Sequence, residues 1–279
     1  MSLYVVLILA IVQSLTEFLP ISSTAHLALS RWLFGWGPTA GVSDLTFDIA
    51  LHLGTLTATV AYFFRDWLQL AAQAFGIGYQ PDAELARNRN LLWMLAVATL
   101  PVGIIGALLE EYAETVFRGP LVIAGMMIGV GVVMWIADRR AFLKKGMDKV
   151  SWTDALIVGC AQALAIVPGT SRSGITITAS LFRNMKRDTA ARFSFLLSTP
   201  ALTGAAIMAV HDVYKAGGIP SELMTDFIAG VAVSAVAGWV VIAWFLRFLR
   251  TRTLRFFVYY RVVFGIIIIA LALFVRRDG

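Results

Sequence analysis

Residues 155–183 read ALIVGCAQALAIVPGTSRSGITITASLFR, an apolar segment interrupted by the polar stretch 168–174. Residues 3–33, LYVVLILAIVQSLTEFLPISSTAHLALSRWL, have the same plan, with polar residues between Gln13 and His26. An ionised group at the centre of a bilayer costs ~3 kcal/mol or more, and broken backbone at that depth is tolerated only where it lines a cavity inside protein. We therefore predict that both segments are re-entrant helix pairs, which enter the membrane and return to the side they came from.

The chain as a whole has the composition of a membrane protein. Of its 279 residues, 59% are hydrophobic and 14% are charged, whereas soluble domains are roughly 45–50% apolar and roughly 25% charged. Six further segments are apolar and long enough to cross a bilayer as helices: 47–64, 91–109, 121–137, 193–210, 226–246 and 256–275. The sequence thus predicts an all-α integral membrane protein with six transmembrane helices and two re-entrant helix pairs, and it argues against a water-soluble enzyme.

The basic residues predict how the chain is oriented in the membrane. Lys and Arg total 23 against 17 Asp and Glu, and sixteen of the basic residues fall in loops on one side of the spans while five fall on the other. Because cytoplasmic loops are enriched in Lys and Arg, the first side is predicted to be cytoplasmic, with both termini and the first re-entrant pair on the outer side. No aromatic and basic motif accompanies the charge, so nucleic-acid binding is not expected. The single cysteine, Cys160, excludes an internal disulfide.

The two polar breaks belong to an internal repeat. Residues 47–58, FDIALHLGTLTA, align with residues 193–204, FSFLLSTPALTG, and serines follow a proline in both breaks. Each half contains one re-entrant pair and three spans, and an odd number of crossings gives the halves opposite orientations. We predict one membrane domain over 1–279, with repeat 1 at about 1–138, a basic cytoplasmic linker at about 139–152 and repeat 2 at about 153–279. In such an inverted repeat the two breaks meet near the middle of the membrane.

The first break concentrates groups suited to metal and acid–base chemistry. Gln13 and Glu17 are four residues apart and share a helix face, Pro20 ends that helix, and the hydroxyl residues 22–24 can cap the next one. His26 lies one turn into that second helix. Such a set could bind a divalent cation, activate a hydroxyl or a water, and protonate a leaving group. The alternative interpretation is that these groups only satisfy one another around a helix kink.

The second break has the composition of a phosphate site. Gly169 lets the backbone approach a ligand closely, and Ser171, Ser173 and Thr176 place hydroxyls around the start of a helix with unpaired N–H groups. Arg172 presents a planar fork of donors that suits phosphate oxygens. Within a membrane this arginine needs an anionic partner, either a bound phosphate or the carboxylate of the first break. Together the two breaks predict phosphoryl transfer or hydrolysis on a lipid-linked phosphate.

The two motifs, QSLTEFLPISSTAH at residues 13–26 and PGTSRSGIT at residues 168–176, resemble those of the undecaprenyl pyrophosphate phosphatase (bacitracin resistance) family. The resemblance covers nearly the full chain. It implies hydrolysis of undecaprenyl pyrophosphate to undecaprenyl phosphate and inorganic phosphate, which recycles the lipid carrier for peptidoglycan and other envelope glycans and confers bacitracin resistance. It also implies dependence on a divalent cation, Mg²⁺ or Ca²⁺, a bacterial inner-membrane location and an active site on the periplasmic side.

Position by position, the resemblance implies roles for individual residues. The acidic, metal-binding motif of the family falls on Gln13 and Glu17, its serine nucleophile candidate on Ser23 and its essential histidine on His26. Its phosphate-binding arginine falls on Arg172, so the implied catalytic set is Glu17, Ser23, His26 and Arg172. The other residues implied for phosphate binding are Ser22, Thr24, Gly169, Ser171, Ser173 and Thr176. Many members have glutamate at the position of Gln13, so metal affinity or stoichiometry is expected to differ here. Whether Ser23 forms a phospho-enzyme or His26 and Glu17 activate water stays open.

Two polar positions inside predicted spans, and the repeat itself, allow further interpretations. Asp48 and His52 are four residues apart at the start of a span, and we interpret them as a helix-surface pair rather than a proton relay. Arg261 lies about one turn inside its span, where snorkelling or ion pairing is expected. Inverted repeats are also the plan of secondary transporters, so a lipid-phosphate flippase or an anion transporter is the alternative function. The oligomeric state stays open, and a homodimer is compatible with the sequence.

Overall fold

The structure is a computed structural model that describes residues 3–36, 44–114, 116–215 and 217–275. Within these ranges the secondary structure is helical and contains no β-strand. The helices long and apolar enough to cross a membrane are α6 (Leu91–Glu114), α7 (Pro120–Arg140), α10 (Arg187–Lys215), α11 (Met224–Leu249) and α12 (Arg255–Val275). A helix of 21 residues, the shortest among them, is about 32 Å long, which matches a hydrocarbon core of about 30 Å. The spans predicted at 91–109, 121–137, 193–210, 226–246 and 256–275 are therefore confirmed as helices.

The remaining predicted span, 47–64, is part of a bent pair of helices. Helix α3 (Asp44–Tyr62) ends one residue before the buried Phe63, and α4 (Phe64–Ala74) continues at an angle of 65°. Asp66 in the first turn of α4 forms an ion pair with Arg192 of α10. This contact and the burial of Phe63 hold α4 across the end of α3. Counted as one broken span, this pair would bring the membrane spans among the described helices from five to six.

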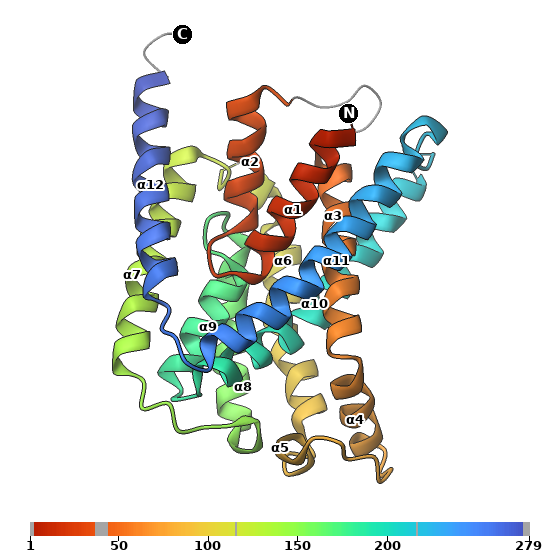
Figure 1. Cartoon of the computed structure of the whole chain (residues 1–279), viewed down its shortest axis with the longest axis vertical. Helices are drawn as coiled ribbons and strands as arrows, with labels where there is room; N and C mark the ends of the chain where they lie inside the picture. Colours follow the sequence, from red (N-terminus) through yellow and green to blue (C-terminus); the bar gives the residue numbers. More distant parts are fainter. Residues whose placement is uncertain (1–2, 37–43, 115, 216, 276–279) are drawn as a thin grey trace.

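Two pairs of short helices correspond to the predicted re-entrant segments. They are α1 (Leu3–Phe18) with α2 (Ser23–Phe34), and α8 (Trp152–Ala163) with α9 (Arg172–Phe182), the second pair being joined through the 3-10 turn η2 (Leu164–Ile166). These helices have 11 to 16 residues, or about 16–24 Å, so none reaches across a 30 Å core alone. Figure 1 shows α1 and α2 toward the end of the molecule where α12 ends, and α8 toward the opposite end.

The two pairs share an uncommon backbone feature at equivalent positions. Ser22 precedes α2 with φ 76° and ψ 100°, and Ser171 precedes α9 with φ 66° and ψ 111°. Positive φ is uncommon for a residue other than glycine and costs of order 1–3 kcal/mol, so the surrounding packing has to hold both serines in place. The matching geometry supports the predicted repeat, whose inversion and boundaries stay predictions.

Small residues bring the helices around the two breaks close together. A Cβ on Gly159 of α8 would lie 2.2 Å from the backbone oxygen of Ala98 in α6, and one on Gly54 of α3 would lie 2.5 Å from that of Val231 in α11. Close approach through small residues is characteristic of membrane helices, where no hydrophobic effect drives association. Only glycine fits at these crossings, which fix the rotation of α8 and α3 about their own axes.

The segment predicted as the linker between repeats is held by polar contacts. It contains the 3-10 turn η1 (Met147–Lys149), and Lys145 forms a salt bridge with Asp154, which also pairs with Arg183. A second ion pair joins distant parts of the chain: Arg192 of α10 pairs with Asp82, which lies in the loop before the short helix α5 (Ala83–Ala86). Burial alone would raise the pKa of Asp82. The backbone N–H of Leu85 and the guanidinium of Arg192 lower the pKa by more than burial raises it, so the pKa lies below its ordinary value.

Candidate active site

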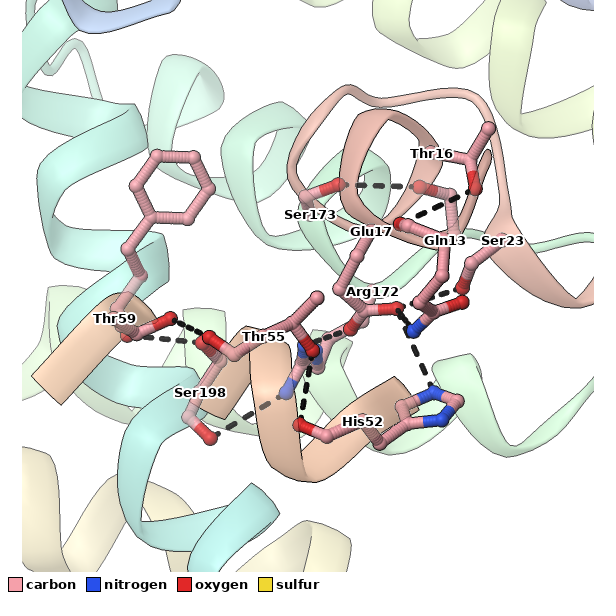
Figure 2. Close-up of polar contacts among 12 residues, drawn as sticks. Gln13, Thr16, Glu17, Ser23, His52, Thr55, Thr59, Arg172, Ser173 and Ser198 are labelled. Carbon is pink, nitrogen blue, oxygen red and sulfur yellow. Dashed lines mark hydrogen bonds and ion pairs between the residues drawn. The ribbon is translucent and has the colours of Figure 1, made fainter. Parts of the chain in front are cut away.

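Glu17 is the centre of the site, near the end of α1 where the first break begins. Its side chain is 6% exposed. Oε2 of Glu17 accepts hydrogen bonds from Nε2 of Gln13 at 3.1 Å and from Oγ of Ser23 at 2.7 Å. Nε2 of His52 in α3 lies 3.6 Å from the same oxygen. Figure 2 shows these side chains converging on the Glu17 carboxylate. The structure therefore places Gln13 beside Glu17, as their spacing predicts, and brings Ser23 to the same carboxylate.

Arg172 joins the second break to the first. It is the first residue of α9, and its Nη2 donates to Oε1 of Glu17 in a salt bridge, while Nη1 donates to the backbone oxygen of Ser198 at 3.4 Å. The Arg172 side chain is 16% exposed. A buried ion pair of this kind is stable only when both charges stay partnered. The two breaks thus share one site, and the carboxylate is the partner of the arginine in the structure.

The hydroxyl residues of the second break divide into two groups. Oγ of Ser171 accepts from the backbone N–H of Gly174 at 3.2 Å and so caps α9, and Ser171 also lines the cavity beside Arg172. Oγ of Ser173 instead donates to the backbone oxygen of Leu19 at 3.1 Å. Oγ1 of Thr176 lies 2.5 Å from Oγ of Ser194. Ser173 and Thr176 tie α9 to its neighbours, and neither lines the cavity.

A cavity of about 240 Å³ lies between the two breaks. The residues that line it come from α1, both breaks, α3, α6 and α10: Thr16, Glu17, Ser22, Ser23, Thr24, His52, Val102, Ala165, Ile166, Val167, Pro168, Gly169, Ser171, Arg172, Ala201 and Leu202. It adjoins a larger cavity of about 880 Å³, because Thr24, His52, Pro168 and Leu202 line both. The two cavities therefore meet at these four residues.

His26 does not line this cavity in the structure. Nδ1 of His26 lies 2.7 Å from the backbone oxygen of Ser22, and Nε2 lies 2.6 Å from the hydroxyl of Tyr260 in α12. The imidazole ring stacks on Phe264 with ring centres 4.3 Å apart. Both nitrogens are thus engaged, and the ring anchors the start of α2 to α12. A catalytic role for His26 stays a prediction drawn from the family resemblance.

His52 is a residue of the site that sequence reasoning missed. The interpretation of Asp48 and His52 as a helix-surface pair is wrong, because the Asp48 carboxylate forms a bidentate pair with Arg31 at 2.5 and 2.9 Å. Nδ1 of His52 lies 2.7 Å from the backbone oxygen of Asp48, which turns Nε2 toward Glu17. The spacing of four residues indicated a shared face but not what that face contacts.

Arg261 of α12 is a second residue whose role was not predicted. Snorkelling is excluded, since its side chain is fully buried. Its guanidinium donates to five backbone carbonyl oxygens, at distances of 2.9 to 3.1 Å: those of Pro20, Met126, Met127, Gly169 and Thr170. Broken helices leave carbonyl groups unpaired, and a buried unpaired carbonyl is costly. Arg261 satisfies carbonyls of both breaks at once and so holds the two loops together.

Gly169 is required by the backbone of the second break. Its φ is +90°, and a Cβ at this position would lie 2.4 Å from the backbone oxygen of Ile123 in α7. Only glycine adopts this conformation at low cost. The prediction that glycine allows close backbone approach here is consistent with this geometry, the neighbour being α7 itself.

The donors around Glu17 fit a divalent cation. Nε2 of Gln13 donates to the Glu17 carboxylate, and Oε1 of the same amide is buried without a hydrogen-bond partner in the structure. Amide and carboxylate oxygens are ligands that Mg²⁺ and Ca²⁺ prefer. Among the described residues there is no group of three or more His, Cys, Asp or Glu side chains arranged to hold a metal. A cation here would therefore need substrate oxygens or water to complete its coordination.

The sequence matches a known protein family over most of its length. The family model described as bacitracin resistance protein BacA matches residues 6–267. The chain is 45% identical over 272 residues to an undecaprenyl-diphosphatase of Pelotomaculum thermopropionicum, covering 98% of this chain and 97% of that protein. It is 46% identical over 264 residues to one of Moorella thermoacetica, covering 95% of each. It is 43% identical over 270 residues to one of Gemmatimonas aurantiaca, covering 97% and 98%.

Proposed function

The chain belongs to the bacitracin resistance protein BacA family, and from this premise we propose that it is an undecaprenyl-diphosphatase. It is a multi-pass membrane hydrolase that converts undecaprenyl pyrophosphate to undecaprenyl phosphate and inorganic phosphate. This reaction returns the lipid carrier to envelope synthesis and accounts for bacitracin resistance as a property of the family. The observation that carries the proposal for this chain is the contact of Glu17 with both Ser23 and Arg172 in one cavity.

The terminal phosphoryl group is attacked in this cavity. We assign Ser23 as the nucleophile and Glu17 as the base that takes its proton, because Oγ of Ser23 already donates to Glu17 at 2.7 Å. The oxygen of Ser23 forms a bond to the terminal phosphorus, and the bond to the bridging oxygen breaks, so undecaprenyl phosphate leaves. Water then hydrolyses the phosphoserine and releases inorganic phosphate. Direct attack by a water activated by Glu17 gives the same products and is the alternative route.

Arg172 balances the charge of the reacting phosphoryl group. Its guanidinium has five N–H donors, of which the protein uses two in the structure, one to Glu17 and one to Ser198. The remaining donors are available to phosphate oxygens, and the start of α9 adds backbone N–H groups near Ser171. We assign Ser22, Thr24, Gly169 and Ser171 to the walls of the phosphate site, since all four line the cavity. Ser173 and Thr176 support it by fixing α9.

Gln13 and Glu17 would hold the divalent cation, which we propose is Mg²⁺ or Ca²⁺. When bound, such an ion neutralises charge on the transferring phosphoryl group. The Glu17 carboxylate is then shared between the ion, the proton of Ser23 and Arg172.

The orientation of the protein in the membrane is proposed from its charges, and its location from its family. We propose a bacterial inner-membrane protein with the cavity and both termini on the outer side, because sixteen basic residues lie in the loops of the opposite side and five on this one. A homodimer stays a prediction from the sequence. Transport of a lipid phosphate or an anion is not proposed, because it would need Arg172 but no hydroxyl activated by a carboxylate.

The test is release of phosphate from a C15 or C55 prenyl diphosphate by the purified protein in detergent. Wild type should release phosphate, and EDTA should stop the release until Mg²⁺ or Ca²⁺ is added back. Glu17→Ala and Arg172→Ala should abolish it, while Glu222→Ala and Arg252→Ala, which remove exposed residues of the same types, should not. Folded, metal-supplied wild-type protein that releases no phosphate would contradict the proposed function.

A further inference from the structure

His52 presents Nε2 to the carboxylate of Glu17. Nδ1 of His52 lies 2.7 Å from the backbone oxygen of Asp48, which only accepts hydrogen bonds, so Nδ1 carries a proton. In the neutral ring Nε2 then carries a lone pair. It lies 3.6 Å from Oε2 of Glu17, which is also an acceptor. In that state two acceptors on different helices face each other across the cavity.

We propose that His52 is a nitrogen ligand of the divalent cation of this site, together with Glu17 and Gln13. The inference rests on the proposed function, because the cation is the one that the hydrolysis would use. A nitrogen and an oxygen 3.6 Å apart could both contact one ion at about 2.1 Å, an ordinary metal–ligand distance. The gap is therefore the right width for one ion to bridge.

Two further features of the site favour a metal ligand. A hydrogen bond from Nδ1 to a backbone carbonyl is the arrangement that fixes the tautomer and the orientation of metal-binding histidines. The bond from His52 to Asp48 lies within α3 and so does not depend on another helix. The amide of Gln13 lies beside Glu17, with Nε2 toward the carboxylate and Oε1 buried without a hydrogen-bond partner. Glu17 of α1 and His52 of α3 thus face each other, with the Gln13 amide next to them.

An imidazole ligand changes which ions the site prefers. Mg²⁺ and Ca²⁺ take oxygen ligands, whereas Co²⁺ and Zn²⁺ bind imidazole well. The loss of His52 should therefore weaken the binding of Co²⁺ much more than the binding of Mg²⁺.

The test uses Co²⁺ and Mg²⁺ as probes of the full-length protein in detergent. Calorimetric titration of wild type, His52→Ala and His211→Ala should give a Kd for Co²⁺ that rises at least about tenfold in His52→Ala, with a smaller change for Mg²⁺. His211→Ala removes an exposed histidine of α10 and should change neither value. A proton NMR spectrum of the Co²⁺-loaded wild type should also show a paramagnetically shifted imidazole N–H that is absent from His52→Ala.

Each outcome bears on the ligand assignment, and phosphate release is measured on the same preparations. Equal Kd values for Co²⁺ in wild type and His52→Ala would overturn the assignment of His52 as a ligand. A Co²⁺-loaded wild type without a shifted imidazole N–H would overturn the same assignment. Wild type that releases phosphate without binding Co²⁺ would overturn it too, and in these three cases the hydrolase function stands. Failure of the function itself is distinguishable, since folded wild type would then bind Co²⁺ but release no phosphate.

Discussion

Replacing Arg261 with methionine tests whether this buried arginine holds the two breaks together. Methionine keeps the length and apolar volume of the side chain but has no donors. The carbonyl oxygens of Pro20, Gly169 and Thr170 lie in the breaks and lose the donor they have in the structure. Those of Met126 and Met127 lie inside α7, where helical hydrogen bonds remain.

The size of the effect follows from these contacts. Each orphaned buried carbonyl costs about 1–3 kcal/mol, so three cost about 3–9 kcal/mol. Removing the buried charge returns several kcal/mol of desolvation energy. We therefore expect a net loss near the lower end, about 3 kcal/mol, which lowers the melting temperature by about 6–12 °C for a chain of this size. Loosening both loops by about 1 Å should also slow hydrolysis by about 10²-fold.

The assay is thermal unfolding of the purified protein in detergent, together with phosphate release. Arg261→Lys keeps the charge but cannot reach both loops with a single nitrogen, so its losses should lie between those of wild type and Arg261→Met. Arg252→Met, at an exposed loop position, is the matched control and should leave both quantities unchanged. If Arg261→Met melts within 2 °C of wild type and hydrolyses at the wild-type rate, the assigned role of Arg261 is wrong.

Three further predictions concern single side chains. Gly169→Ala should lower the melting temperature by several degrees, because residue 169 has φ +90° and a Cβ there would overlap the backbone of α7. The control Gly125→Ala, with open space around it, should be neutral or stabilising, and equal melting temperatures of the two variants would argue against the tight contact at Gly169. Ser23→Ala should reduce phosphate release by about 10²-fold or more through loss of the nucleophile, and a rate near that of wild type would favour direct attack by water. Asp82→Asn should lower the free energy of unfolding at pH 7. The pKa of Asp82 is depressed in the folded protein, so its ion pair with Arg192 stabilises the fold fully at pH values above the unfolded pKa of about 3.9. This stabilisation is lost as the pH falls from that value through the lower pKa of the folded protein. A difference in melting temperature that persists unchanged at pH 3 would contradict this reasoning.

The helices could be predicted because long apolar segments determine them. Five predicted spans match helices of sufficient length, and the polar breaks mark both short pairs. The bend of 65° at Phe63 could not be predicted. The ion pair between α4 and α10, Asp66 with Arg192, joins two residues 126 positions apart, whose proximity exists only in the folded chain. Local sequence in this region indicates only one apolar segment.

The composition of the site was more predictable than its geometry. The repeat pattern predicted that Glu17 and Arg172 share one site, because inverted repeats bring their broken helices together. The position of His52 depends on how α3 is rotated. Gly54 contacts α11 closely, and a residue two positions earlier lies about 200° around the helix, which turns His52 away from α11 and toward the cavity. Arg261 binds carbonyls that only the folded breaks expose, so no pairing of charges in the sequence could indicate them.

The most direct test of the central claim is a kinetic double-mutant cycle between Glu17 and Arg172. Glu17→Asp and Arg172→Lys keep both charges but shorten or reshape the side chains, so rates of phosphate release stay measurable. If the two residues act on one phosphoryl group in one cavity, the double variant should be about as slow as the slower single variant, with a coupling energy of at least about 1 kcal/mol. If the two losses simply multiply, Glu17 and Arg172 act independently, and the account of a single site shared by the two breaks is contradicted.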